Sequence, residues 1–248
     1  MRDPEATYDA AFYAAQRDGS RRAAALVVPR VLAWTGARSV VDVGCGTGAW
    51  VEAALALGVD VGFGIDGPHV PLACRGLPPA AFLEADLARP LRLDVRFDVA
   101  FCLEVAEHLD AARADGFVAD LCALAPVVVF SAAVPGQGGD GHVHEAWPDA
   151  WARRFASHGY RWSDPFRRWL WTADGVPPWY AQNLLLFAAP GAFAALPAEA
   201  RAGADEHPWP LPLVHPAIHR RLARLARPTW RNAWRSLRGA LGFRGHPV

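Results

Sequence analysis

The feature that most constrains the fold is the stretch Ser39–Trp50, SVVDVGCGTGAW, in which an apolar run enters a glycine-rich turn. Its valines suit a buried parallel strand, and residues 49–57 read as the helix that follows. Gly44, Gly46 and Gly48 let the backbone between them turn sharply beside a ligand. The stretch therefore predicts a strand, a turn and a helix that together form a nucleotide-type cofactor pocket.

The spacing of these glycines separates the pocket from that of dinucleotide-binding proteins. It is GxGxG, whereas dinucleotide binders have GxGxxG. The next strand-like run, Val59–Ile65, ends at an acidic residue, Asp66. We expect a carboxylate at that place to accept hydrogen bonds from a ribose diol.

Three runs that follow one another in the chain, VVDVGCGTGAW, GFGIDG and FLEADL, resemble class I S-adenosylmethionine-dependent methyltransferases. The resemblance covers roughly residues 20–189. It implies an α/β fold, a Rossmann-like sandwich whose seven-stranded, mostly parallel sheet has an antiparallel last strand and helices on both faces. It also implies S-adenosylmethionine as the cofactor.

The resemblance also implies which residues bind the cofactor. In this family an acidic residue after the third strand accepts a hydrogen bond from the adenine amino group, and the backbone of the next residue serves a ring nitrogen. Asp86 and Leu87 match those positions. The full set implied is Asp42, Gly44, Cys45, Gly46, Gly48, Asp66, Gly67, Asp86, Leu87 and Leu103.

The remaining elements are expected from hydrophobic periodicity and turn residues. Ser20 resembles an N-cap that separates a short helix, Thr7–Arg17, from a second helix ending at Trp34. We divide the chain into an N-terminal helical cap (1–36), a methyltransferase domain (37–190) and a Pro/Ala-rich linker with an Arg-rich helical tail (191–248). Further expectations are strands at 81–84, 97–103, 127–132 and 183–188, a helix at 147–158, and an edge strand at 161–171 broken by Pro165.

Composition sets broad limits on partners and location. The 25 basic and 25 acidic residues balance, so no overall field attracts nucleic acid, and we expect nucleic acid not to be a partner. The four cysteines lack CxxC pairing, which suits free thiols in a reducing cytoplasm. The N-terminal residues lack the order of a signal peptide, and no apolar run is long enough to span a bilayer. We therefore expect a cytoplasmic protein.

A second motif, Glu104-Val105-Ala106-Glu107-His108, follows the strand expected at 97–103. On a helix, its spacing would place Glu104, Glu107 and His108 on neighbouring rows of one face. Two carboxylates and an imidazole that converge in this way could bind a metal ion. The alternative is that the same residues cap a helix or contact the substrate.

This ExxEH pattern is similar to that of small-RNA 3′-terminal 2′-O-methyltransferases and ubiquinone-pathway O-methyltransferases, in which it is associated with a divalent ion. His142 and His144 lie close to the glycine-rich loop expected after the neighbouring strand. The implied metal ligands are Glu104, Glu107, His108 and His142, for Mg²⁺, Mn²⁺, Fe²⁺ or Zn²⁺. The catalytic candidates are His108, His144 and Glu107, with His144 either a further ligand or the general base.

A closer likeness runs through CLEVAEHL, VVVFSAAVPGQGG and HVHEAWPDAW. These runs resemble a bacterial branch of the class I methyltransferases associated with glycan or secondary-metabolite pathways. That branch usually has asparagine where this chain has His144, which favours His142 as the ligand. The implied acceptor is a small molecule or a glycan.

These observations favour metal-assisted O-methylation of a vicinal diol on a sugar, glycan or secondary metabolite, because a bound cation lowers the pKa of a hydroxyl. Three alternatives stay open: N-methylation of an amino sugar, 2′-O-methylation of small RNA, and a non-catalytic scaffold that binds the cofactor.

The C-terminal region carries arginines but no acidic residue from His215 onward. Ile218–Ala226 and Thr229–Leu241 are helix candidates. A basic amphipathic tail of this kind could support a homodimer or a peripheral membrane contact. The alternative is that the tail packs on the catalytic domain.

Overall fold

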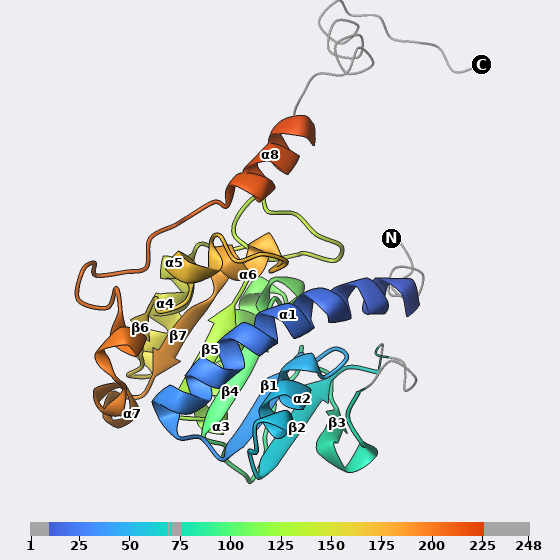
Figure 1. Ribbon diagram of the computed structural model, residues 1–248, viewed down its shortest axis with the longest axis vertical. Coiled ribbons are helices and arrows are strands. Elements are labelled where there is room, and N and C mark those ends of the chain that lie inside the picture. Colours follow the sequence, from blue (N-terminus) through green and yellow to red (C-terminus); the bar gives the residue numbers. More distant parts are fainter. Residues whose placement is uncertain (1–9, 69, 71–75, 226–248) are drawn as a thin grey trace, which may run out of the picture.

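The computed structural model describes residues 10–68, 70 and 76–225, and its centre is one seven-stranded sheet (Figure 1). The strand order is β3-β2-β1-β4-β5-β7-β6. The strands are β1 Ser39–Val43, β2 Val61–Asp66, β3 Phe82–Glu84, β4 Val99–Leu103, β5 Val127–Ser131, β6 Arg161–Ser163 and β7 Leu185–Ala188.

The pairing of the strands confirms the predicted sheet. The five strands β3, β2, β1, β4 and β5 pair in parallel, and β7 runs antiparallel to both β5 and β6. The strand order reverses between β1 and β4, which lie side by side in register with Asp42 opposite Phe101. In an open α/β sheet a ligand binds outside the carboxyl ends of the strands at such a reversal.

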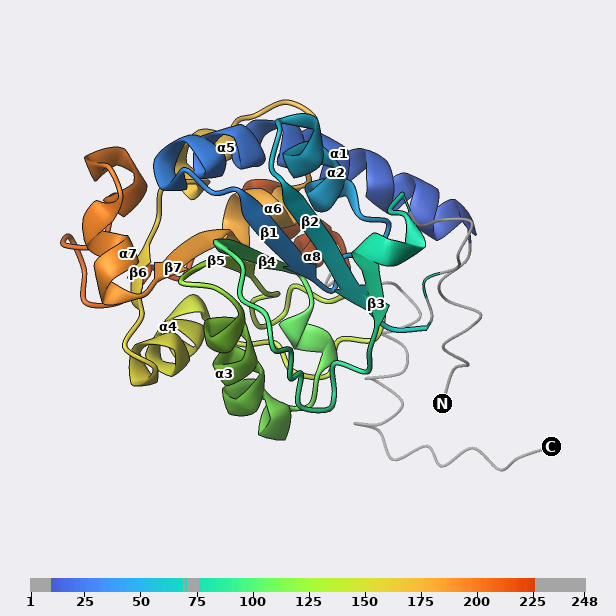
Figure 2. The same cartoon turned by 90° about the horizontal axis from the view of Figure 1, so that it is seen from below.

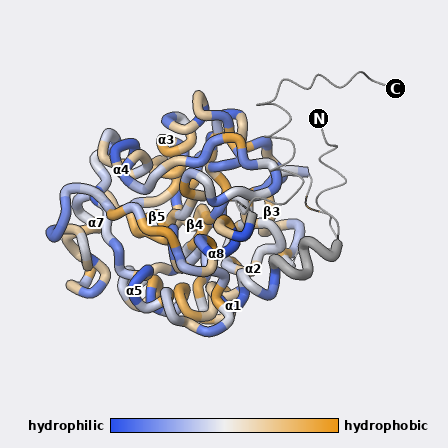
Figure 3. Tube along the Cα trace, turned by 90° about the horizontal axis from the view of Figure 1, so that it is seen from above, coloured by the Kyte–Doolittle hydropathy of each residue, from blue (hydrophilic) through white to orange (hydrophobic). Residues whose placement is uncertain are grey.

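Helices cover both faces of the sheet, and each face has its own core (Figure 2). One core packs α1, α2, α6 and α7 on the sheet, and the other packs α3 and α4. Hydrophobic stretches follow the central strands, whereas α8 is mostly hydrophilic (Figure 3). The helices are α1 Ala10–Thr35, α2 Ala49–Ala56, α3 Ala114–Leu124, α4 Pro148–Ser157, α5 Arg167–Leu170, α6 Pro178–Asn183, α7 Pro190–Ala195 and α8 Pro216–Leu225.

The N-terminal region differs from the prediction, because α1 is one continuous helix and not two. Ser20 lies inside it and does not cap a new helix. Its hydroxyl instead pairs with the hydroxyl of Tyr180, 3.0 Å away. A serine side chain satisfied by a tertiary partner has no need to cap a helix, so the helix continues to Gly36, whose φ of 64° ends it as predicted.

The edge of the sheet is also shorter than predicted. The strand expected over 161–171 stops at Ser163, and Arg167–Leu170 forms α5. The carboxylate of Asp164 accepts hydrogen bonds from the backbone N–H of Arg167 at 3.3 Å and from its Nε at 2.9 Å. This local pairing starts a helical turn where an extended chain was expected.

The division of the chain into three parts stays a prediction, and the region after residue 190 packs closely on the sheet domain. Phe193 and Ala200 belong to the core beside α1. The hydroxyl of Ser163 donates to the carbonyl of Ala200 at 2.7 Å. The first predicted tail helix is present as α8, and the second, Thr229–Leu241, lies outside the described residues. Within the described part of the chain, no helix combines the length and apolar character that crossing a bilayer requires.

Candidate functional site

The glycine turn after β1 is held against the end of β2. The backbone N–H of Gly44 donates to the carbonyl of Ile65 at 2.7 Å. The two carboxylate oxygens of Asp66 accept from the N–H of Gly46 at 2.6 Å and of Gly67 at 2.7 Å. Asp66 therefore orders the turn through charge-assisted hydrogen bonds.

Asp42 lies beneath this turn and is the most unusual group near it. It is 2% exposed, and its Oδ2 atom has no hydrogen-bond partner among the described residues. Burial, and then the charge of Asp66, raise its pKa well above the usual range. A buried carboxylate oxygen without a donor suits a cationic ligand group such as the amino group of S-adenosylmethionine.

The unpaired Asp42 side chain lines a cavity of about 30 Å³ beside the glycine turn. That volume holds roughly a water molecule and not a nucleoside. Two positions of the turn have no room for a side chain: a Cβ at Gly44 would lie 2.2 Å from the side chain of Val105, and one at Gly48 would lie 2.6 Å from Leu77. The residues that line this cavity are Ser20, Asp42, Gly44, Cys45, Gly46, Thr47, Ala49, Trp50, Leu103 and Tyr180.

Five of the expected cofactor residues thus line one cavity, and the other five lie outside its wall. Gly48 precedes α2 with a φ of 86°. Asp86 is exposed and accepts from the N–H of Ala88 at 3.0 Å. Leu87 is part of the core on the α3 side.

Glu104 does not lie on a helix, which corrects the prediction of a helical face for the second motif. Its φ is 57°, a left-handed value that is uncommon for a residue other than glycine. Its N–H donates to the carbonyl of Ser131 at 2.9 Å, which keeps the backbone aligned with β5. Only a short 3₁₀ turn, Ala106–His108, follows. Strained backbone of this kind is concentrated at functional sites.

Two amide side chains hold the carboxylate of Glu104. Oε1 accepts from Nδ2 of Asn183, and Oε2 accepts from Nε2 of Gln137, each at 3.0 Å. Burial raises the pKa of Glu104, and the bonds with Asn183, Ser131 and Gln137 only partly oppose that rise. The sequence analysis missed both amides, because neutral amides have no motif that identifies a partner far along the chain.

Glu107 is fully buried beside Glu104. One carboxylate oxygen accepts from the N–H of Ala133 at 3.2 Å, and Oε2 has no hydrogen-bond partner among the described residues. Burial, and then the charge of Glu104, raise the pKa of Glu107 well above the usual range. Its unpaired oxygen is available to a cation.

The structure brings Glu107, His108 and His142 together. Their ligand atoms lie within 4.8 Å of one another, and the rings of the two histidines are 5.0 Å apart and nearly perpendicular. Two imidazoles and one carboxylate are a donor set that transition metals bind. Glu104, which was expected as a fourth ligand, is not part of this group.

Glu145 supports the group, although the sequence analysis did not select it. Its carboxylate lies 2.9 Å from Nδ1 of His142 and accepts from the N–H groups of Gly136 and Gly138, both at 2.7 Å. Burial alone would raise the pKa of Glu145, but the bonds from His142 and the two glycines lower it. A carboxylate on the other nitrogen of a histidine is the usual second partner of a metal ligand. The HxxE spacing could have indicated this pair.

The backbone N–H of His144 donates to the carbonyl of Glu107 at 3.0 Å, but its side chain is not among the grouped ligand atoms. Its ring packs against Trp151 with the centroids 5.4 Å apart. Burial, and then the charge of Arg154, lower its pKa. Nor does it line the cavity of about 720 Å³ on whose wall Glu107, His108 and His142 lie.

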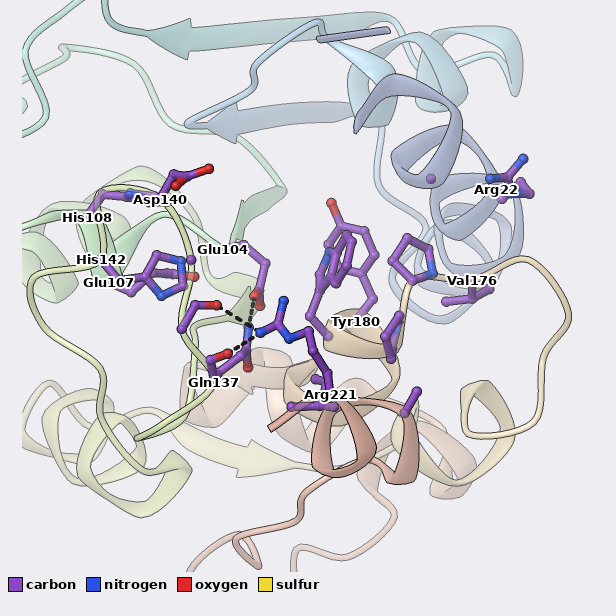
Figure 4. A pocket seen from close by; sticks show the side chains of 18 of the residues that line it. Arg22, Glu104, Glu107, His108, Gln137, Asp140, His142, Val176, Tyr180 and Arg221 are labelled. Carbon is purple, nitrogen blue, oxygen red and sulfur yellow. Dashed lines mark hydrogen bonds between the residues drawn. The ribbon is translucent and has the colours of Figure 1, made fainter. Parts of the chain in front are cut away.

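The large cavity has a volume of about 720 Å³ and lies between the glycine-rich loop that follows β5 (residues 134–141), α6 and α8 (Figure 4). Carboxyl and imidazole groups gather on one side of it, and Arg22 and Val176 lie on the opposite side (Figure 4). Tyr180 lines both this cavity and the small one, so both spaces border on this residue. The lining residues are Gly19, Arg22, Glu104, Glu107, His108, Gln137, Gly138, Gly139, Asp140, His142, Gly175, Val176, Pro177, Pro178, Trp179, Tyr180, Ala217, Ile218 and Arg221.

Comparison with known proteins extends this picture. No protein-family model and no curated protein matches the sequence. Among solved structures, the chain is similar to SAM-bound CalS10, an amino pentose methyltransferase from Micromonospora echinaspora, with 20% identity, a TM-score of 0.54, and coverage of 73% of this chain and 97% of that one.

Two further structures have the same fold. Streptomyces venezuelae DesVI gives a TM-score of 0.55 at 16% identity over 76% of this chain and 100% of that one. An O-methyltransferase family protein from Burkholderia thailandensis gives a TM-score of 0.51 at 16% identity over 74% of this chain and 60% of that one. The chain therefore has the Rossmann-like fold found in S-adenosylmethionine-dependent methyltransferases.

Proposed function

We propose that the protein is an S-adenosylmethionine-dependent methyltransferase that methylates a hydroxyl group of a small hydroxylated acceptor, with the help of a divalent cation. One observation carries the proposal: the group Glu107, His108 and His142 stands on the wall of a cavity that shares the residue Tyr180 with the small cavity beside the glycine turn. A methyl donor in the turn and an acceptor in the large cavity would then be neighbours.

The residues near the glycine turn account for binding the donor. The carboxylate of Asp42 would pair with the amino group of the methionine part, which removes the cost of its buried unpaired oxygen. The glycines let the ligand approach the backbone closely. When bound, S-adenosylmethionine supplies a methyl group on a positively charged sulfur.

Glu107, His108 and His142 are the residues that would hold the cation, and Glu145 would orient His142. A divalent cation there lowers the pKa of an acceptor hydroxyl. In the transfer, the sulfur–methyl bond breaks and an oxygen–methyl bond forms. The hydroxyl proton leaves to water, which reaches the site past the exposed side chain of His108.

The cavity also bears on the class of acceptor. Its volume of about 720 Å³ lies in the range of small-molecule sites. The apolar wall of Val176, Pro177 and Trp179 suits the face of a sugar ring or an attached apolar group. We therefore propose a sugar, a glycan terminus or a hydroxylated secondary metabolite that presents a vicinal diol.

The experiment that tests cofactor binding is calorimetric titration with S-adenosylmethionine. The intact protein should bind it, and Gly46→Arg or Asp66→Ala should abolish binding. Asp66→Ala removes the acceptor of the hydrogen bond that orders the turn, and Gly46→Arg places a long side chain on a residue of the turn whose φ is 52°. Gly191→Ala is the matched control, since a Cβ there meets no atom within 4 Å. An intact protein that does not bind the cofactor would refute the proposal.

A second candidate is N-methylation of an amino sugar. Three carboxyl groups, Glu104, Glu107 and Asp140, line the cavity together with Arg22 and Arg221, and they could accept hydrogen bonds from an amine. CalS10, which shares the fold, is named as an amino pentose methyltransferase. In this reading, His108 is the residue at the cavity that could receive the amine proton. Methylation that survives exhaustive chelation, with an amine as the only accepted substrate, would favour this candidate over the first.

A further inference from the structure

Three buried amides connect the acceptor cavity to the interior. Gln137, Gln182 and Asn183 are 5%, 0% and 3% exposed. Nε2 of Gln182 donates to Oε1 of Gln137 at 2.9 Å, and that oxygen also accepts from Nδ2 of Asn183 at 3.0 Å. Because Gln137 and Asn183 also donate to Glu104, this amide network fixes the direction in which its carboxylate points.

The segment Leu211–Arg221, which precedes and begins α8, holds the other side of the amide network. The backbone N–H of His215 donates to Oε1 of Gln182 at 2.7 Å. The buried side chain of Arg167 donates to the carbonyl of Leu211 at 2.8 Å. Both the nitrogen and the oxygen of the Gln182 amide are therefore engaged, and one of its three hydrogen bonds comes from the C-terminal segment.

The same segment reaches the cavity itself. Arg221 donates through Nη2 to the carbonyl of Gln137, and also to the carbonyl of Gly138 at 3.2 Å. Figure 4 shows its guanidinium next to Gln137 and Glu104. Ile218, one turn earlier on α8, is 4% exposed and lines the cavity.

We infer that α8 is a part of the acceptor site through Ala217, Ile218 and Arg221, and that Arg221 is a positioning residue that orients Glu104 through Gln137. A guanidinium bound to two successive carbonyls fixes the turn from which the Gln137 side chain projects. If that turn shifts, one donor to Glu104 shifts with it. Glu104 stands on the cavity wall, so the acceptor would lose an oriented hydrogen-bonding group.

The inference deepens the proposed function and rests on it for its activity measurement. Arg221→Ala should lower kcat/KM for methyl glycosides with vicinal diols by roughly 10- to 100-fold, since a shift of about 1 Å in a positioning group can cost this much. The Kd for S-adenosylmethionine should stay within about twofold, because no residue of α8 lines the cofactor cavity. Arg221→Lys, which keeps a cationic donor, should recover part of the loss.

Arg220→Ala is the matched control. Arg220 is exposed on the same helix and does not line the cavity, so its loss should leave turnover unchanged. Equal turnover in the Arg221→Ala and Arg220→Ala proteins would overturn the inference.

Hydrogen exchange gives a readout that needs no acceptor. The backbone amides of Gly136, Gln137 and Gly138 should exchange at least severalfold faster in the Arg221→Ala protein than in the control protein. The reason is that the hydrogen bonds from the Arg221 side chain to the carbonyls of this turn are gone. Equal exchange rates would overturn the inference even if methyl transfer were never observed. Failure of the intact protein to bind S-adenosylmethionine would instead refute the proposed function alone.

Discussion

Gly139→Ala tests the role assigned to His142 without changing that side chain. A Cβ at Gly139 would lie 2.2 Å from Nε2 of His142, 2.6 Å from Cε1 and 2.7 Å from Cδ2. The φ of Gly139 is not in the left-handed region, so alanine fits the backbone. The strain therefore falls on the imidazole, which has to move.

The required movement sets the size of the effect. To reach an ordinary contact of 3.4 Å from a clash at 2.2 Å, the ring must shift by about 1.2 Å. That shift also disturbs the 2.9 Å contact of Nδ1 with Glu145. A displacement of about 1 Å at a reacting site can cost roughly 100-fold in rate, which is our expected loss of turnover.

The assay is methyl transfer from labelled S-adenosylmethionine, together with elemental analysis for bound metal. We expect turnover and bound metal to fall together in the Gly139→Ala protein, while cofactor affinity and the melting temperature stay close to those of the wild type. Gly191→Ala, with no atom within 4 Å of its new Cβ, is the control. Turnover within twofold of wild type would show that His142 has no part in the reaction.

Three further predictions concern the carboxylates and the metal. Glu107→Gln should abolish bound metal and turnover but keep cofactor binding, since the amide oxygen can still accept from Ala133; calorimetry and elemental analysis check this, and full turnover would contradict it. Exhaustive EDTA treatment should remove hydroxyl methylation and added Mn²⁺ or Zn²⁺ should restore it, so an undiminished rate in metal-free protein would remove the cation from the mechanism. The pKa of Asp42 is raised in the folded protein, so there is a range of pH in which its carboxyl group is protonated in the folded state and ionised in the unfolded state. The wild type should therefore lose stability as the pH rises from about 3.9, the pKa of the unfolded chain, towards the folded-state pKa. Asp42→Asn should lack that loss, so in thermal unfolding the variant should exceed the wild type in stability by more at pH 8 than at pH 5. Its cofactor binding should be weaker. An equal difference in stability at both pH values would contradict this assignment.

The sequence by itself determined the sheet and the glycine turn after β1. Val40, Val41 and Val43 favour a buried strand, and a glycine at position 44 permits the φ of 79° that the turn requires. These are local requirements of neighbouring residues, so periodicity and glycine spacing identify them. The antiparallel last strand was predicted on the resemblance, and the pairing of β5 with β7 confirms it.

Local rules failed where a distant partner replaced a local one. Ser20 has the chemistry of an N-cap, but its hydroxyl pairs with Tyr180, 160 positions along the chain. Glu104 has the spacing of a helical face, but its backbone bonds to β5 and holds it in a left-handed conformation. In both places tertiary contacts outweighed a local preference worth about 1 kcal/mol.

Only the tertiary structure decided the composition of the acceptor site. Gln137 and Arg221 are 84 positions apart, and Glu104 and Asn183 are 79 apart, yet each pair is in hydrogen-bonding contact. Neutral amides and an arginine among many arginines form no periodic pattern, and their partners are fixed only when the sheet brings the ends of β4, β5 and β7 to one edge. The order of the residues along the chain therefore identified where a cofactor could bind, and the folding of the sheet and of α8 decided which side chains face the acceptor, because hydrogen bonds depend on proximity in space and not on separation in sequence.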